Sequence, residues 1–288
     1  MTPRRADVLL LAACFLWGVS FVIVKGALDH ASPLAFVAVR FALAAVLFAP
    51  FAGLGTRFTV PELRAGALLA LLLAAGFIAQ AAGLVYTTPS RSAFLVAISS
   101  VLAPPIAILA LRERPRAPAV VALIVAAVGT WLLTAPGGGG LNRGDALTLI
   151  TAVAFGGQIV AITALSRRHT LTRLLWLQIA GTALLAGVGA PLVEVVRLEW
   201  SASFIAALAF TAIGATVVAL LWQLQAQREM SSTRAAVLFC SEALFAAVTS
   251  WLVLGETLSA EQWVGSGLIL GAMILAELPA RAHRTTGT

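Results

Sequence analysis

The stretch DVLLLAACFLWGVSFVIVKGAL, residues 7–28, is an apolar run long enough to cross a lipid bilayer as an α-helix. A second stretch, DALTLITAVAFGGQIVAITAL at residues 145–165, echoes it weakly just past the middle of the 288-residue chain. An echo at this distance predicts an internal repeat. In membrane proteins, such repeats are typical of two halves that enclose a shared pathway.

The composition indicates a membrane protein. Hydrophobic residues make up 60% of the sequence and charged residues 11%, and the mean hydropathy is +0.99. Because a soluble domain carries more charge on its exterior, we expect an all-α membrane protein with ten transmembrane helices. The expected spans are residues 6–28, 33–53, 64–86, 91–111, 118–135, 144–165, 172–193, 202–226, 232–254 and 262–279.

The basic residues predict the orientation. With the N-terminus in the cytoplasm, 14 of the 19 basic residues lie on the cytoplasmic side, four lie on the other side and one lies within a span. Since short loops rich in Arg and Lys stay in the cytoplasm, both termini are predicted to be cytoplasmic. The net charge of +7 then reflects topology and does not point to a nucleic-acid partner. The 14 are Arg4, Arg5, Arg57, Arg64, Arg112, Arg114, Arg116, Arg167, Arg168, Arg173, Arg228, Arg234, Arg281 and Arg284; the four are Lys25, Arg91, Arg143 and Arg197; the one is Arg40.

The echo extends along both halves at two offsets. An offset of 138 residues pairs Asp7 with Asp145, Trp17 with Phe155, and Arg40 with Gln178. Further along, an offset of 143 residues pairs Gln80 with Gln223, Arg91 with Arg234, and Glu113 with Glu256. Each half holds five spans, an odd number, so the second half is predicted to enter the membrane inverted relative to the first. The predicted units are residues 1–136, a Gly-rich linker at 137–143, residues 144–280, and a cytoplasmic tail at 281–288.

Four segments resemble a known family. They are FLWGVSF at 15–21, Arg40-Phe41, SEALFAAVTSWLVLGE at 241–256 and QWVGSGLILGAMIL at 262–275. Together they are similar to the drug/metabolite transporter superfamily in its EamA-domain branch, and within it to bacterial exporters of aromatic amino acids. The resemblance implies a multi-pass exporter of metabolites in the bacterial inner membrane, with amino acids prominent among its cargoes. The chain departs from the family pattern at Ala243, where proline is common, and at Phe155, where tryptophan is common.

Two charged residues lie well inside predicted spans, where a charge is costly unless it is buried in the bundle or faces water. Arg40 is expected to attract a carboxylate, and Glu242 an ammonium group or a proton. The alternative is a structural role, in which each side chain joins two helices by a hydrogen bond or an ion pair.

Amide, hydroxyl and aromatic residues complete the candidate substrate-binding set. Gln80, Gln158, Trp17 and Ser99 are expected to line the pathway, although packing between helices would also explain them. Weaker candidates for gating or for lining the cavity are Tyr86, Trp176, Gln178 and Gln223. The GxxxG pair Gly267 and Gly271 permits close helix contact within one chain or between two, so a monomer or a weak homodimer is expected.

Several classes of function are disfavoured. The run PGGGG at 136–140 lacks the GK[ST] ending of a phosphate-binding loop, which argues against ATP-driven pumping. His30, His169 and His283 fall outside the spans, so neither a metal site nor a catalytic cluster is expected, and no cofactor is predicted. We therefore expect a secondary transporter, not an enzyme, that exports small neutral metabolites, amino acids first, by alternating access. The alternatives are a proton-coupled exporter of drugs or other metabolites, a passive solute channel, and a scaffold or membrane enzyme that transports nothing.

Overall fold

The computed structural model describes residues 3–113, 115, 117–134, 142–254 and 259–277, and the regular structure in these ranges is helical. An isolated bridge between Ala31 and Leu198 joins two loops. The elements are α1 (Pro3–Ala27), α2 (Pro33–Phe48), η1 (Ala49–Phe51), α3 (Val60–Leu84), α4 (Pro89–Leu111), α5 (Ala117–Thr134), α6 (Arg143–Leu165), α7 (Leu171–Val193), α8 (Ala202–Ala209), η2 (Phe210–Val218), α9 (Ala219–Gln227), α10 (Ser232–Phe239), α11 (Ser241–Leu254) and α12 (Ala260–Glu277).

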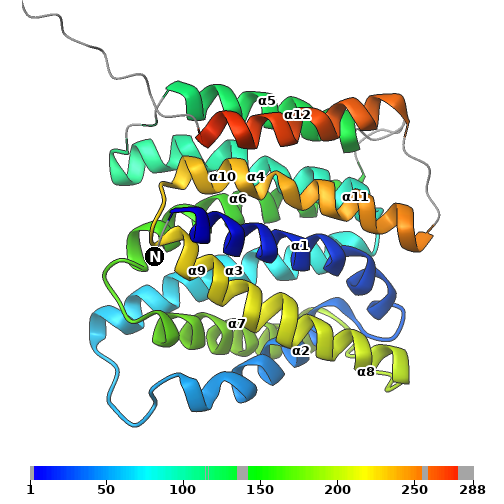
Figure 1. Ribbon diagram of the computed structural model, residues 1–288. Coiled ribbons are helices and arrows are strands. Elements are labelled where there is room, and N and C mark those ends of the chain that lie inside the picture. The colour runs from blue at the N-terminus through cyan, green and yellow to red at the C-terminus, as the bar shows by residue number, and fades with distance from the viewer. Residues whose placement is uncertain (1–2, 114, 116, 135–141, 255–258, 278–288) are drawn as a thin grey trace, which may run out of the picture.

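Each of the ten predicted spans coincides with a helix or with consecutive helices. Elements α8, η2 and α9 form one continuous rod, and α10 meets α11 at Cys240 (Figure 1). Within the described ranges, seven helices are long and apolar enough to cross a membrane. Three apolar helices are shorter, at Leu95–Leu111, Ala117–Leu132 and Ala260–Leu275. The helical class is therefore confirmed, while ten membrane passes and cytoplasmic termini stay predictions.

Helix termini follow local signals in the sequence. Thr59 and Glu62 form a capping box at the start of α3, and Asn142 and Asp145 form another at the start of α6. In each box, a side chain satisfies a backbone N–H that has no partner within the helix. Helix α4 continues through Pro104 and Pro105 without a break in its assignment.

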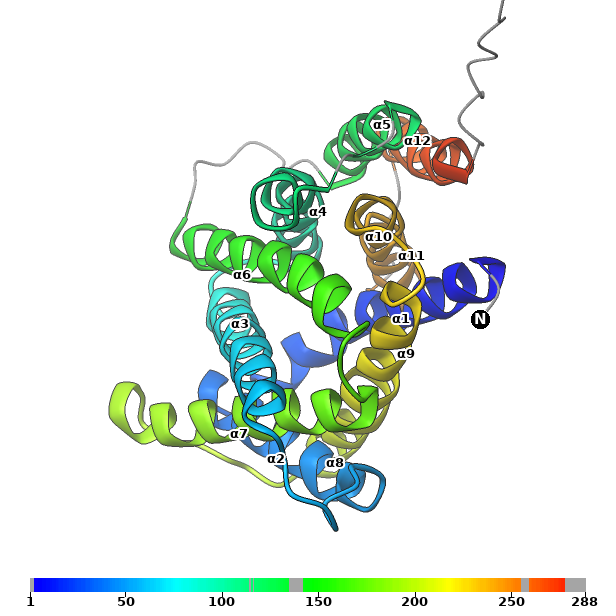
Figure 2. The ribbon, with the colours of Figure 1, turned by 90° about the vertical axis from the view of Figure 1, so that its left-hand side faces the viewer.

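The two halves pack in equivalent ways. Helix α1 lies against α9 and α11, and α6 lies against α3 and α4, as the two offsets require (Figures 1 and 2). Equivalent helices are antiparallel where they meet. Trp176, near the start of α7, donates to the carbonyl of Ala45 near the end of α2, at 3.1 Å. Gly129, near the end of α5, lies against Gly265 near the start of α12. These contacts are those that an inverted repeat requires.

The ends of the bundle carry two similar contacts, which we call the end clamps. Lys25 on α1 donates to the carbonyls of Leu84 and, at 3.1 Å, Thr87. Beyond the end of α6, Arg167 donates to the carbonyls of Arg228 at 3.0 Å and Met230 at 2.9 Å. Thr87 and Met230 are equivalent under the offset of 143. Carbonyls at helix C-termini lack partners within the helix and attract cations.

The end clamps lie at opposite ends of the molecule. The hydroxyl of Thr87 donates to Asp145 at the start of α6, at 3.4 Å, so α6 begins at the end where α1 finishes. At the other end, Arg234 of α10 pairs with Asp7 of α1. Arg167 lies at that second end, because Met230 immediately precedes α10. Each clamp therefore joins the first and third helical rods of its own half, at opposite ends of the bundle.

The ion pair between Asp7 and Arg234 fastens the start of α1 to the start of α10 with bonds of 2.7 and 3.1 Å. Because Asp7 is 5% exposed, we expect Asp7→Asn to lower the free energy of unfolding by about 1–3 kcal/mol. Thermal unfolding of the purified protein in detergent measures this. Asp29→Asn, at an exposed loop residue, is the control. Equal melting temperatures for both variants and the parent would contradict the prediction.

Candidate functional site

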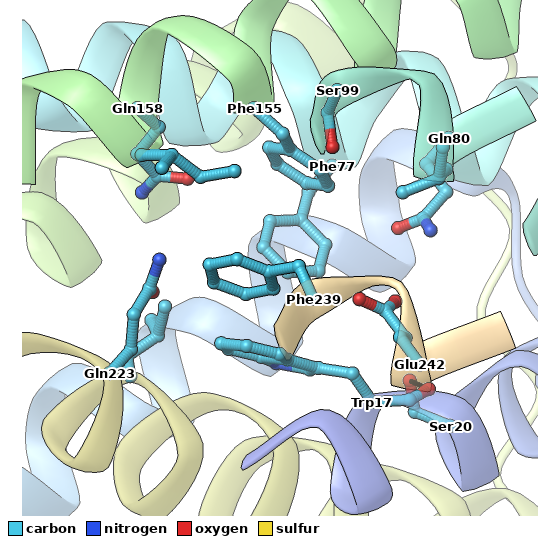
Figure 3. A pocket seen from close by; sticks show the side chains of 13 residues that line it. Trp17, Ser20, Phe77, Gln80, Ser99, Phe155, Gln158, Gln223, Phe239 and Glu242 are labelled. Carbon is cyan, nitrogen blue, oxygen red and sulfur yellow. Dashed lines mark hydrogen bonds between the residues drawn. The ribbon is translucent and has the colours of Figure 1, made fainter. Parts of the chain in front are cut away.

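A pocket lies in the middle of the bundle, among α1, α3, α4, α6, α9, α10 and α11 (Figure 3). Its empty volume, which includes space open to the surroundings, is about 500 Å³. Of its 13 lining residues, Glu242 is the one with an ionisable side chain. The lining consists of Trp17, Ser20, Phe77, Gln80, Val96, Ser99, Phe155, Gln158, Ile159, Leu220, Gln223, Phe239 and Glu242.

The repeat relates the lining residues to one another. The offset of 138 for α1 and the offset of 143 for α3 and α4 group twelve of the 13 residues into six pairs, leaving only Ile159 without a lining partner. Both halves thus present the same positions to one cavity. The pairs are Trp17 and Phe155, Ser20 and Gln158, Phe77 and Leu220, Gln80 and Gln223, Val96 and Phe239, and Ser99 and Glu242.

Two equivalent glycines bring the helices close enough to form this pocket. A Cβ atom at Gly18 would lie 2.9 Å from the carbonyl oxygen of Glu242. A Cβ at Gly156 would lie 3.1 Å from the carbonyl oxygen of Ser99. The first contact joins α1 to α11 and the second joins α6 to α4. Small residues at such crossings let helix backbones approach closely, and here they place Glu242 and Ser99 beside the cavity.

Aromatic rings form much of the pocket wall. Trp17 stacks on Phe239 with ring centroids 5.8 Å apart, and Phe77 meets Phe155 edge to face at 5.2 Å (Figure 3). The indole Nε1 of Trp17 donates to the carbonyl of Ala215, at 2.8 Å. Ala215 lies in η2, a π-helical segment, and such segments often occur at functional sites. The bond fixes the indole, so the aromatic part of the wall has a defined geometry.

Glu242 lies in the first turn of α11, immediately after the break at Cys240. The N-terminus of a helix favours a negative charge, which offsets part of the cost of burying a carboxylate. The side chain points into the cavity (Figure 3). Among the described residues, it has no hydrogen-bond or ion-pair partner. The carboxylate is therefore available to a solute or a proton.

The amides differ in how far they are satisfied. Gln158 donates from Nε2 to Oε1 of Gln178, at 3.3 Å. Gln223 is 3% exposed and its Oε1 has no partner in the described part of the chain. Gln80 is half-buried and also lacks a hydrogen bond there. Buried amides are normally hydrogen-bonded, so these groups leave capacity for water or a solute.

The structure gathers most of the predicted binding residues, but not all of them. Trp17, Gln80, Ser99, Gln158, Gln223 and Glu242 line the pocket. Arg40 lines a smaller cavity beside it. Gln178 supports Gln158 from behind. Neither pocket is lined by Tyr86, whose ring lies 5.3 Å from the Arg143 guanidinium, or by Trp176, which stacks on Phe58. Both rings are instead engaged close to helix ends.

Sequence reasoning missed Ser20, Phe77 and Phe239, because small and apolar residues do not stand out within apolar spans. The repeat offers a signal for one of them, because an offset of 138 leads from Gln158, a predicted residue, back to Ser20. No grouping of His, Cys, Asp and Glu suited to a metal occurs in the described ranges.

The model of the EamA-like transporter family matches the chain twice, at residues 4–135 and 142–278. The chain belongs to the EamA-like transporter family. This confirms the resemblance to the EamA-domain branch, including its repetition. An EamA-like transporter is a multi-pass membrane protein, and the family points to transport of small solutes rather than to an enzyme.

Similar proteins agree with this assignment. An "Uncharacterized transporter" of Archaeoglobus fulgidus is 34% identical to this EamA-like protein over 273 residues, covering 95% of this chain and 86% of the relative. The "Uncharacterized inner membrane transporter YicL" of Salmonella typhimurium is 25% identical over 299 residues, covering 97% of both chains. A solved crystal structure superposes with a TM-score of 0.80 over 96% of this chain and 99% of that one. Its 19% identity shows a shared fold alone.

The glycine contact at the pocket predicts a packing effect. We expect Gly18→Ala to destabilise the protein by about 1–3 kcal/mol, because the added Cβ would lie 2.6 Å from the Cβ of Phe245. Gly26→Ala on the same helix is the matched control, since no atom lies within 4 Å of its added Cβ. Alanine has the higher helix propensity of the two residues, so neither change weakens the helix itself. Thermal unfolding in detergent compares them, and a Gly18→Ala protein as stable as the control would show that the contact is not tight.

Proposed function

We propose that this EamA-like protein is a secondary transporter that exports small, largely neutral organic solutes, amino acids first, by alternating access. The observation that carries the proposal is the central pocket, to which the two halves contribute equivalent positions and which contains a single carboxylate. The proposed setting is a bacterial inner membrane, with ten passes and cytoplasmic termini. The proposed halves are residues 1–136 and 144–280, joined by the linker 137–143 and followed by the tail 281–288.

The chemistry of the pocket supports a solute with an amine and an apolar body. Aromatic walls favour an apolar group, and a ring can also attract a cation. Glu242 supplies the negative charge and the amides supply hydrogen bonds. Because an added methylene changes hydrophobic binding only modestly, such a pocket discriminates weakly among similar side chains. Broad selectivity among amino acids and related amines is therefore expected.

The end clamps support alternating access. Each clamp closes the contact between the first and third helical rods of one half, and the two clamps lie at opposite ends. In this mechanism, breaking one clamp opens the pocket to one side while the other clamp keeps the opposite end shut. Motions of this kind occur around a fixed site in transporters with inverted repeats.

One feature favours a second candidate, a proton-coupled exporter of drugs or other metabolites. Glu242 has no partner in the described part of the chain, so it can exchange a proton for a cationic solute. A passive channel is less well supported, because aromatic side chains make up much of the pocket wall and the clamps join helices at both ends of the bundle. Saturable flux that is stimulated by solute on the opposite side would distinguish a carrier from a channel.

Because Glu242 is proposed to bind the cargo, its replacement is expected to impair transport. In proteoliposomes, Glu242→Gln should reduce the uptake of labelled phenethylamine and L-phenylalanine by about tenfold or more, because a charge-assisted hydrogen bond is lost. Its residual uptake should also respond less to pH than that of the parent. Glu261→Gln, at an exposed residue of α12, is the control. Unchanged uptake at every pH would remove Glu242 from the mechanism.

The end clamps predict increased access to the pocket from opposite sides of the membrane. In a background with Cys14→Ala, Cys240→Ala and Ser99→Cys, an impermeant maleimide reports access to the pocket from each side of oriented vesicles. Lys25→Met should increase labelling from one side, and Arg167→Met should increase it from the other. Arg64→Met, at an exposed residue that takes part in neither clamp, is the control. An increase from the same side in both variants, or in neither, would contradict alternating access through these ends.

A further inference from the structure

Arg40 is the largest of the fully buried side chains, with 2% of its surface exposed. Its Nε donates to the hydroxyl oxygen of Thr216 at 2.8 Å, and that hydroxyl in turn donates to the carbonyl of Thr211 at 2.8 Å. The chain of bonds fixes one edge of the guanidinium against η2. The Nη2 atom on the guanidinium has no hydrogen-bond partner in the described part of the chain.

Two rings lie near the guanidinium. Its central carbon lies 4.7 Å from the ring centroid of Phe77 and 5.4 Å from that of Phe41. These contacts attract the cation but do not neutralise it. Across the described residues, no carboxylate pairs with Arg40. A buried guanidinium without a counter-charge is unfavourable in hydrocarbon, so this geometry favours binding of an anion from outside the described part of the chain.

A small cavity lies beside Arg40, and its empty volume of about 280 Å³ includes space open to the surroundings. It shares Ser20, Phe77 and Gln80 with the central pocket, so the two spaces adjoin. It extends as far as Leu84, whose carbonyl accepts from Lys25 in the first end clamp. The Gln80 amide, which has no hydrogen bond among the described residues, faces both spaces.

We propose that this side cavity binds a monovalent anionic group, held by the guanidinium of Arg40 and by the amide of Gln80. The inference rests on the proposed function and narrows its cargo to solutes with a carboxylate. Guanidinium groups bind carboxylates through charge-assisted hydrogen bonds. A zwitterionic amino acid would place its ammonium group at Glu242 and its carboxylate in the side cavity. A free anion such as chloride would use the same donors.

The second half supplies a neutral counterpart. Gln178 occupies the position equivalent to Arg40, and its Nε2 atom also lacks a partner in the described ranges. The cation is therefore a feature of one half only. Arg40→Gln places in the first half the residue that the second half already accommodates while fully buried.

The test compares three probes that share a phenyl ring: L-phenylalanine, phenethylamine without the carboxylate, and 3-phenylpropanoate without the amine. Binding is measured by thermal shift on the full chain in detergent. Arg40→Gln should weaken binding of the two carboxylate probes at least about tenfold more than binding of phenethylamine. Glu242→Gln should instead weaken binding of the two amine probes, phenethylamine and L-phenylalanine, more than binding of 3-phenylpropanoate. Arg64→Gln, which removes an exposed cation, is the control.

Chloride distinguishes the source of the anion. If chloride stabilises the parent but not Arg40→Gln and competes with 3-phenylpropanoate, the cavity binds free anions; if chloride has no effect, it binds the carboxylate of the cargo. Equal binding of the carboxylate probes by parent and Arg40→Gln, or no anion binding by the parent, overturns the proposal. If Arg40→Gln does not fold, Gln80→Leu must weaken 3-phenylpropanoate binding, and unchanged binding overturns it equally. Phenethylamine flux that depends on Glu242 would leave the proposed function standing in either case.

Discussion

Gly18 and Gly156 place α1 and α6 directly against the backbones of α11 and α4, and the rest of the site depends on these two contacts. Association of helices in lipid relies on close packing and hydrogen bonds, because hydrocarbon surrounds the helices in any case. A side chain at either glycine would push apart the helices that carry Glu242 and Ser99. The central pocket therefore exists because the same small residue stands at the same place in both halves.

The halves differ where the chemistry lies. Ser99 and Glu242 are equivalent positions, but only one carries a charge, and Arg40 has a neutral counterpart in Gln178. The backbone differs too, because η2 is π-helical whereas the equivalent part of α3 is a regular α-helix. Trp17 and Arg40 both bond to η2. The inverted repeat forms the cavity. The differences between the two halves give it a charged side and fix the aromatic wall.

The helices could be predicted because hydropathy depends on local composition alone. The repeat could be predicted because similar residue types recur at fixed offsets along the chain. Polar side chains within apolar spans were equally visible, so Gln80, Gln158 and Glu242 were found in advance. Ser20 and Phe239 were not found, because they line the pocket only as a result of how their helices pack against the others. Tyr86 and Trp176 were proposed as gates but lie outside both pocket linings, since an aromatic near a helix end is also explained by local ring contacts. The depth of a residue within a span can be predicted from its position in the sequence, but the direction in which its side chain points depends on how the helices pack.

The end clamps show most clearly a similarity between the two halves that a comparison of their sequences does not reveal. The donors differ, because Thr163 occupies the position equivalent to Lys25 and receives a hydrogen bond from Gln227, while Arg167 lies one turn further along. Two of the acceptors match, because the carbonyls of Val85 and Thr87 correspond to those of Arg228 and Met230, whereas the carbonyl of Leu84 accepts only in the first clamp. Every residue has a backbone carbonyl, so the sequence does not indicate which carbonyls accept these bonds. Matching side chains between the two halves therefore cannot detect this symmetry. A lysine offers a point charge and an arginine a planar fork. In a carrier that alternates between two openings, this difference would make one end easier to open than the other.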